Sequence, residues 1–168
     1  VPSQLVYVPY RFGDEKIIRL PITTGAASGT SITGALIRGI CEVVERDAFV
    51  TNYLNKLPGK LVDLSNTSND IINKIMEEYR NYDIEPHVFD ITTDINIPTM
   101  MCILLDSSGK GPAVAVGLKS HLDPEDAIIG CLEEAQHSRP WIRSLMVNGK
   151  LKLKNMKKQM ESMSTLEE

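Results

Sequence analysis

The chain is poor in cysteine, and its three cysteines form no pattern typical of a crosslinked or metal-binding protein. Cys41, Cys102 and Cys131 are widely spaced, odd in number and placed in apolar segments. This spacing excludes a disulfide framework and the paired cysteines of a zinc site. Since free cysteines are often core residues, we expect three buried thiols in a reduced, cytoplasmic compartment.

Long apolar runs and an excess of positive charge are also missing. No run approaches the roughly 20 apolar residues of a membrane-spanning helix, and no basic segment followed by an apolar one marks a signal peptide. The chain has 18 basic and 22 acidic residues, for a net charge of −4, which argues against a nucleic-acid binder driven by phosphate attraction. Neither nucleic acid nor a membrane is therefore expected as a partner.

Helical and strand-like segments alternate, which predicts an α/β (α+β) domain with a mixed β-sheet and packed helices. The expected strands cover residues 5–10, 16–20, 61–64, 84–91, 98–105 and 113–117. The expected helices cover residues 32–54, 69–82 and 123–137. Pro140 cannot donate a backbone hydrogen bond and is expected to kink or restart the last helix.

One domain over residues 1–146 fits the length of 168 residues. Residues 147–168 are rich in Lys, Met and Glu and are expected to form a peripheral helix or a partly disordered tail. The sequence starts without Met and enters strand-like residues at once, which we interpret as a piece of a longer protein.

A loop of small residues precedes the first long helix. Positions 24–31 are Gly, Ala, Ser and Thr only, and they include Ser28 and Gly29. Small residues at a helix N-terminus let backbone N–H groups approach a phosphate, although no Gly-Lys-Ser/Thr follows, so a Walker A loop is excluded. A tight strand-to-helix turn is the alternative. Thr30 or Ser31 is expected to cap the helix.

Glu42 and Glu45 lie three residues apart and therefore on one face of this helix. Two close carboxylates suit Mg²⁺, which takes one or two carboxylates together with substrate phosphates. The alternative is a solvated face on which Glu42 pairs with Arg46.

The opposite face of the same helix is expected to be buried, because its apolar residues recur at helical spacing. This expected apolar stripe contains Leu36, Ile40, Val43, Val44, Val50 and Leu54. Asp47 falls inside the stripe, so we expect a buried carboxylate with a fixed partner.

A second polar face lies on the last helix and combines an acid, an amide and two arginines. Its members are Glu133, Gln136, Arg139 and Arg143. This combination suits a metal–phosphate site, since Arg neutralises phosphate charge. The alternative is an exposed face, and no residue is singled out as catalytic.

Two sequence motifs contain the acidic residues of these two polar faces. Thr-Gly-Ala-Ala-Ser-Gly-Thr-Ser at 24–31, followed by Glu-Val-Val-Glu-Arg-Asp-Ala at 42–48, resembles the first signature of the YcaO family. The second signature, a helix with Glu-x-x-Gln, appears as Glu133-Glu-Ala-Gln136 about 90 residues later. The resemblance extends from Val1 to about Met146.

The resemblance implies ATP- and Mg²⁺-dependent activation of a peptide backbone amide. A nucleophile adds to the carbonyl, the oxyanion attacks the γ-phosphate, and loss of phosphate completes the exchange. A side-chain nucleophile gives an azoline and a sulfide donor gives a thioamide. Carried over to this chain, the metal ligands are Glu42, Glu45 and Glu133. The nucleotide or phosphate contacts are Gln136, Arg139 and Arg143, and the edge of the site is the loop with Ser28 and Gly29.

The segment 136–143 resembles the archaeal branch associated with thioamide formation, including glycine thioamidation of methyl-coenzyme M reductase. That branch often works with a TfuA-type partner protein. We therefore favour thioamide formation in a peptide or protein substrate. The alternatives are an azoline-forming cyclodehydratase of ribosomal peptides and a non-catalytic peptide- or nucleotide-binding module. A homodimer stays open. Family members are usually longer at both ends, so we expect a fragment that does not turn over alone.

Overall fold

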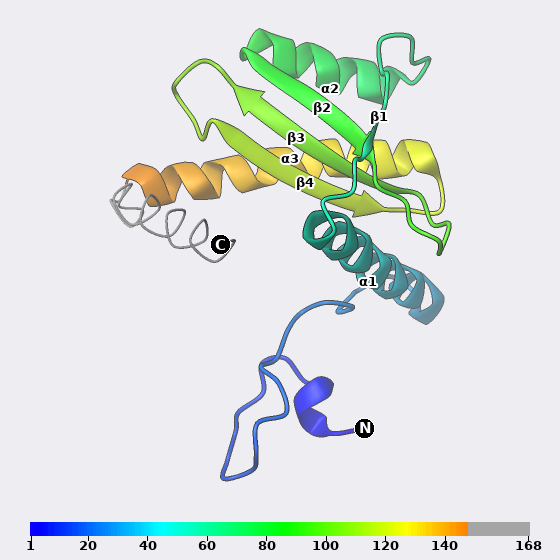
Figure 1. The fold of residues 1–168 in the computed structure, drawn as a ribbon, viewed down its shortest axis with the longest axis vertical. Helices are drawn as coiled ribbons and strands as arrows, with labels where there is room; N and C mark the ends of the chain where they lie inside the picture. The colour runs from blue at the N-terminus through cyan, green and yellow to red at the C-terminus, as the bar shows by residue number, and fades with distance from the viewer. Residues whose placement is uncertain (148–168) are drawn as a thin grey trace.

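The computed structural model describes residues 1–147 of the chain as one antiparallel sheet with helices on it (Figure 1). The elements are η1 (Ser3–Leu5), α1 (Ile32–Leu54), β1 (Lys60–Leu61), α2 (Asp70–Asn81), β2 (Ile84–Asp90), β3 (Thr99–Asp106), β4 (Val114–Ser120) and α3 (Pro124–Val147). The strand order is β1-β2-β3-β4, with every pairing antiparallel. The predicted α/β (α+β) class with helices packed on a sheet is confirmed, but the sheet is antiparallel throughout and not mixed as predicted.

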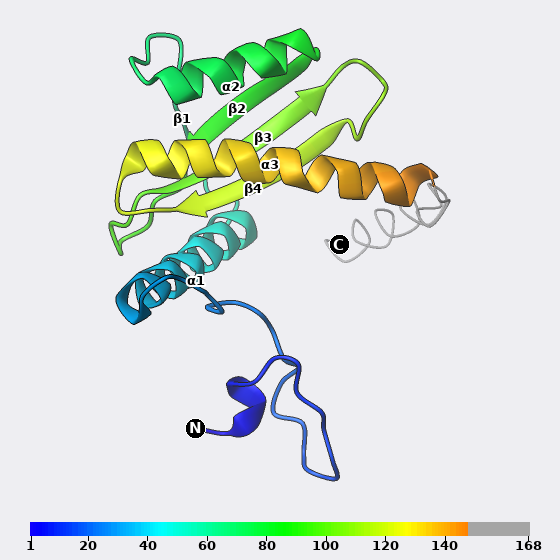
Figure 2. The same cartoon turned by 180° about the vertical axis from the view of Figure 1, so that it is seen from behind.

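One face of the sheet carries the main core. In Figure 2 both α2 and α3 lie across this face. Directly paired strand residues share a face, so the pairs Val88–Cys102 and Leu104–Ala115 point toward these helices. The helices contribute Ile72, Tyr79, Ala127, Ile128, Cys131, Leu132 and Ala135. The apolar run predicted as a central strand is β3, which is paired on both sides.

Gly117 sets how closely α3 approaches β4. A side chain at this position would overlap two backbone atoms of α3, the Cys131 carbonyl oxygen and the Ala135 nitrogen. Only the absence of a Cβ lets the helix lie directly on the strand. This contact also fixes the position of Glu133 and Glu134 of α3 relative to the C-terminal end of β4.

Local signals predicted the ends of α1 and α2 well. The helix predicted over 32–54 is confirmed, and Ser31 caps it by accepting a hydrogen bond from the Gly34 N–H at 3.1 Å. The helix predicted over 69–82 is α2, with Asn69 as its N-cap. Side-chain capping of free N–H groups depends on adjacent residues only, which explains why the sequence suffices here.

The predicted buried face of α1 is wrong. Among the expected stripe only Val44 is buried, whereas Leu36, Ile40, Val43, Val50 and Leu54 are exposed. The residues that α1 buries are Gly39, Cys41, Val44, Glu45 and Ala48. Asp47 is exposed, and Glu45 is the buried carboxylate. The small side chain of Ala48 lets α1 lie close to Leu118 of β4 and to Ile91, which follows β2. The buried face of α1 is therefore the one that packs closely, and not the one with the most apolar residues.

Three further expectations about elements need correction. The strands expected at 5–10 and 16–20 are absent, since the Gln4 side chain bonds to Lys16 and Ile18 in place of a strand ladder. The strand expected at 61–64 is confined to Lys60–Leu61. α3 continues through Pro140 to Val147, so the helix does not restart. The expectation for the tail falls almost wholly outside the described residues.

No helix within residues 1–147 is long and apolar enough to cross a membrane.

Candidate functional site

A cavity of about 860 Å³ lies between α1 and α3, at the C-terminal end of β4. We call it the acidic cavity. Its charged and titratable lining residues are Arg38, Cys41, Glu42, Glu45, Arg46, Lys119, His121, Asp126, Glu133 and Glu134. Five of these are acids and three are Arg or Lys, so carboxylates are in excess in the lining. Such a surface attracts cations, and its basic residues give an anion separate points of contact.

The small-residue loop forms one edge of the acidic cavity. The Gly25 N–H donates to Glu42 Oε2 at 3.0 Å, and Arg38 Nη1 donates to the Ser28 carbonyl oxygen at 3.0 Å. Gly39 lets the loop lie against α1, because a Cβ there would come within 2.8 Å of the Gly25 oxygen. Ser28 lines the cavity, whereas its neighbour Gly29 is exposed and outside the lining.

Glu45 is the most buried acid of the cavity, with 4% of its surface exposed. Its Oε2 accepts a hydrogen bond from the Ser120 N–H at 3.1 Å, and its Oε1 lies 3.6 Å from Arg46 Nη2. Burial, and next the charge of Glu134, raise the pKa of Glu45 above its usual value. The Ser120 hydrogen bond, Arg46 and Lys119 oppose this rise. The carboxylate is therefore held in place, but its charge is compensated only in part, which favours a bound cation.

Glu134 is the acid of α3 that faces Glu45, and sequence reasoning missed it. Arg46 Nη2 lies 3.9 Å from Glu134 Oε1, so one guanidinium lies close to both carboxylates. Glu133 also lines the cavity but is exposed, and its charge acts on Tyr79 of α2. The helical phase gave only a partial signal, because residue 134 adjoins the buried positions Cys131 and Ala135 whereas residue 133 points away from them. Which element Glu134 faces depends on the tertiary structure.

Gln136, Arg139 and Arg143 do not join this group. They line a second cavity of about 780 Å³, formed by the α2–β2 turn, the β3–β4 loop and the later turns of α3. The two linings share no residue. The structure therefore brings together Ser28, Glu42, Glu45 and Glu133 of the predicted site, and places its amide and arginines elsewhere.

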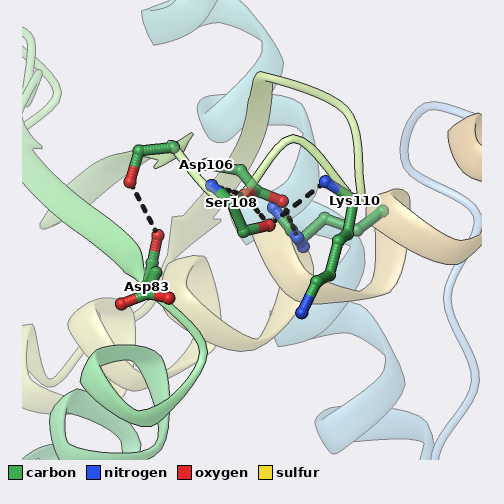
Figure 3. A network of polar contacts seen from close by, with 6 residues as sticks. Asp83, Asp106, Ser108 and Lys110 are labelled. Atoms are coloured by element: carbon green, nitrogen blue, oxygen red, sulfur yellow. Dashed lines mark hydrogen bonds and ion pairs between the residues drawn. The ribbon is translucent and has the colours of Figure 1, made fainter.

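Asp106 lies beside Ser108 and Lys110 of the β3–β4 loop (Figure 3). Arg139 of α3 holds this loop through Asp106. Its Nη2 donates to Asp106 Oδ2 at 2.6 Å, and the Ser108 N–H donates to Asp106 Oδ1 at 2.8 Å. Hydrogen bonds from Ser108, and next from Arg139, hold the pKa of Asp106 below its usual value. Arg139 Nη1 is buried and has no hydrogen-bond partner in the described part of the chain. Nη2 of the guanidinium therefore has a structural role, whereas Nη1 can still donate a hydrogen bond.

The three cysteines are buried and free, as predicted. Cys41 lies at the wall of the acidic cavity. Burial, with Glu45 as a minor contribution, raises the pKa of the Cys41 thiol and outweighs the opposing charge of Lys119. A raised pKa keeps sulfur protonated, so Cys41 is suited to packing and not to nucleophilic attack.

A metal ion in the acidic cavity would need ligands from the protein together with ligands from phosphate and water. In the part of the chain that the structure describes, no three His, Cys, Asp or Glu side chains form a group that could hold a metal ion. Mg²⁺ commonly binds through one or two carboxylates and completes its shell with phosphate oxygens and water. Glu45 beside Glu134, with Glu42 one turn away, fits that manner of binding and not an all-protein cage.

Comparison with known proteins relates the whole chain to one family. The sequence model described as YcaO cyclodehydratase, ATP- and Mg²⁺-binding, matches residues 1–167. An uncharacterized protein of Methanothermobacter thermautotrophicus is 35% identical over 142 residues, which are 83% of this chain and 37% of that protein. An uncharacterized protein in the tfuA 3′ region of Rhizobium leguminosarum bv. trifolii is 29% identical over 125 residues, which are 68% of this chain and 30% of that protein.

Solved structures show the same arrangement of elements. A heterocyclase in complex with substrate and cofactor matches with a TM-score of 0.73 and 28% identity, over 80% of this chain and 18% of that one. The YcaO protein of Methanopyrus kandleri bound with AMPPCP and Mg²⁺ matches with a TM-score of 0.67 and 19% identity, over 88% of this chain and 38% of that one. The chain thus spans less than two fifths of the length of each of these proteins.

Proposed function

Since the chain belongs to the YcaO family of ATP-dependent enzymes, we propose that its acidic cavity binds ATP with Mg²⁺ and that the protein activates a peptide backbone amide. The observation that carries the proposal is Glu45, a buried carboxylate with a raised pKa that faces Glu134 across the cavity. Two such carboxylates attract a divalent cation, and the excess negative charge is then relieved.

One or two carboxylates would hold the metal together with phosphate oxygens and water, and the candidates that line the cavity are Glu42 and Glu45 of α1 and the Glu133–Glu134 pair of α3. Of that pair, Glu134 is favoured by its electrostatic contact with Glu45 and its position beside Arg46. Bound ATP would supply an electrophilic γ-phosphate that takes the amide oxygen and leaves with it as phosphate. The Ser120 N–H keeps the Glu45 carboxylate oriented, and Arg46 limits the repulsion between Glu45 and Glu134.

The loop before α1 would contact the nucleotide through Ser28, with Gly29 outside the cavity wall. Glu42 already engages the Gly25 N–H, so the loop stays close to the metal ligands. The nucleotide contacts of Gln136, Arg139 and Arg143 stay a prediction. The free Nη1 of Arg139 supports it, and the position of all three in the second cavity weighs against direct contact with the same phosphates.

For the product we propose a thioamide in a peptide or protein, made with a TfuA-type partner. The relative whose name places it in a tfuA 3′ region supports this choice. The alternative is azoline formation, which the likeness to a heterocyclase supports. Glycine thioamidation of methyl-coenzyme M reductase is the most specific form of the first proposal, and it rests on the sequence resemblance alone.

An ATP-consumption assay on the full-length protein with candidate peptides, with and without sulfide, tests the proposal. We expect ATP turnover that needs peptide and Mg²⁺, and mass spectrometry should show sulfur in place of oxygen. Loss of water from the peptide without sulfide would favour the azoline alternative. Absence of ATP binding would contradict the proposal and favour a non-catalytic binding module.

A further inference from the structure

Lys119 is a cation of the acidic cavity with no neutralising contact. Arg46 lies between Glu45 and Glu134, and Arg38 donates to the Ser28 carbonyl oxygen. Within residues 1–147, by contrast, no hydrogen bond or ion pair engages the Lys119 ammonium group. Its side chain is half-buried and reaches the cavity from β4.

Gly130 of α3 leaves room for the Lys119 side chain. A Cβ at Gly130 would lie 2.5 Å from Lys119 Cγ, 2.8 Å from its Cδ and 3.2 Å from its Cβ. Glycine in a helix interior is less favourable than alanine by about 1 kcal/mol. At this place its missing side chain admits the Lys119 stem between β4 and α3. The stem is therefore confined, and the ammonium group can swing little.

The charge of Lys119 acts on two residues of α1. It lowers the pKa of Glu45 and of Cys41, although burial dominates at both groups. Both residues belong to the face of α1 that lines the acidic cavity. Lys119 therefore belongs to the same cavity wall as these residues of α1 and Ser28 of the small-residue loop.

We propose that Lys119, confined by Gly130, binds a phosphate group of the nucleotide in the acidic cavity. The inference rests on the proposed function, since it takes ATP as the occupant. A lysine ammonium is a compact charge with three donors, which suits phosphate oxygens. The carboxylates then hold the metal, and Lys119 offsets phosphate charge that the metal leaves unneutralised.

Binding of Mg²⁺–ATP, adenosine and inorganic tripolyphosphate to Lys119→Met tests the proposal, with calorimetry on the full-length protein. We expect affinity for Mg²⁺–ATP and for tripolyphosphate to fall about 10-fold or more, because a charged hydrogen bond is lost, and adenosine affinity to stay unchanged. Lys119→Arg should retain part of the affinity. Lys74→Met is the matched control, since Lys74 is exposed on α2 and lines neither cavity, and it should bind like the parent.

Gly130→Ala displaces Lys119 without removing its charge. We expect it to weaken Mg²⁺–ATP binding as well, and Lys119→Met added to it should cost little more, since the two changes act on one interaction. Thermal unfolding without nucleotide checks that each variant is folded.

Parent-like binding of Mg²⁺–ATP and tripolyphosphate by a folded Lys119→Met variant would overturn the role of Lys119 alone. Failure of the unmodified protein to bind any of the three probes would overturn the proposed function and this inference together.

Discussion

At the scale of single residues, Glu45 combines burial with a charge that Arg46 compensates only in part. Its surface is 4% exposed, and the nearest guanidinium atom is 3.6 Å from its Oε1 and is shared with Glu134. Burying a charge without full compensation costs stability. Such a residue lowers the stability of the ligand-free protein, and residues of this kind are typical of binding sites.

Glu45→Gln should therefore stabilise the protein in the absence of ligands. Because the folded pKa of Glu45 is raised, the parent loses stability as pH rises from 4.5 through that folded pKa. The glutamine oxygen can still accept from the Ser120 N–H. We expect a gain of about 1 kcal/mol in unfolding free energy at pH 7 and none at pH 4, from urea titrations without metal. A loss of stability at pH 7 would show that the carboxylate is stabilising.

Glu134→Gln and Glu133→Gln separate the two adjacent acids of α3. Glu134 acts on Glu45 across the cavity, whereas Glu133 is exposed and its charge acts on α2. We expect Glu134→Gln to weaken Mg²⁺–ATP binding by about 10-fold or more, and Glu133→Gln to weaken it less, both by calorimetry. The reverse order would identify Glu133, as first predicted, and not Glu134 as the metal ligand of α3.

At the scale of elements, the contact of α3 with β4 depends on Gly117. A methyl group there overlaps backbone atoms of Cys131 and Ala135, which cannot move without the whole helix. We expect Gly117→Ala to cost about 3 kcal/mol of unfolding free energy in urea titrations. Gly109→Ala is the comparison, since its φ is +71° but no atom lies nearby, and it should cost about 1 kcal/mol. Equal effects would show that α3 tolerates displacement.

The β3–β4 loop depends in the same way on the pair of Asp106 and Arg139. The two side chains are 1% and 13% exposed and lie 2.6 Å apart. We expect Asp106→Asn to cost about 3 kcal/mol at pH 7, since it leaves a buried charge unpaired. Asp83→Asn should change stability by less than about 0.5 kcal/mol, because Asp83 is exposed.

The pH dependence of this pair has a definite sign. The folded pKa of Asp106 is lowered from 3.8, so its stabilising contribution is present above pH 3.8 and is lost as pH falls through the folded pKa. The difference between parent and Asp106→Asn should therefore shrink below pH 4. A constant difference across that range would mean that the charge of Asp106 is not what stabilises the loop.

At the scale of the whole molecule, the sheet is covered unequally. α2 and α3 bury one face, while α1 covers only the region around Leu118 on the other (Figures 1 and 2). The outer side of α1 and the strand residues Leu105, Val114 and Val116 leave apolar side chains exposed. Contiguous exposed apolar surface is typical of a contact surface.

Leu36→Lys and Ile40→Lys, at the exposed face of α1, test this view of the surface. Both side chains are more than half exposed, so we expect unfolding free energies within about 0.5 kcal/mol of the parent. Binding of a hydrophobic dye to the 168-residue chain should fall. Val44→Lys is the control, because Val44 is buried and its replacement should unfold the chain. Strong destabilisation by Leu36→Lys would mean that this face is packed in solution.

The sequence by itself determined the helices, the central strand, the family signatures and the acids of α1. Each depends on neighbours in the chain, as when Ser31 caps α1 or Asn69 caps α2. Only the tertiary structure decided which face of α1 is buried, that Glu134 and Lys119 enter the cavity, and that Arg139 does not. Those outcomes depend on contacts such as the one from Ser120 to Glu45, 75 residues apart. Periodicity places side chains around their own helix, but the partner surface decides which of them meet.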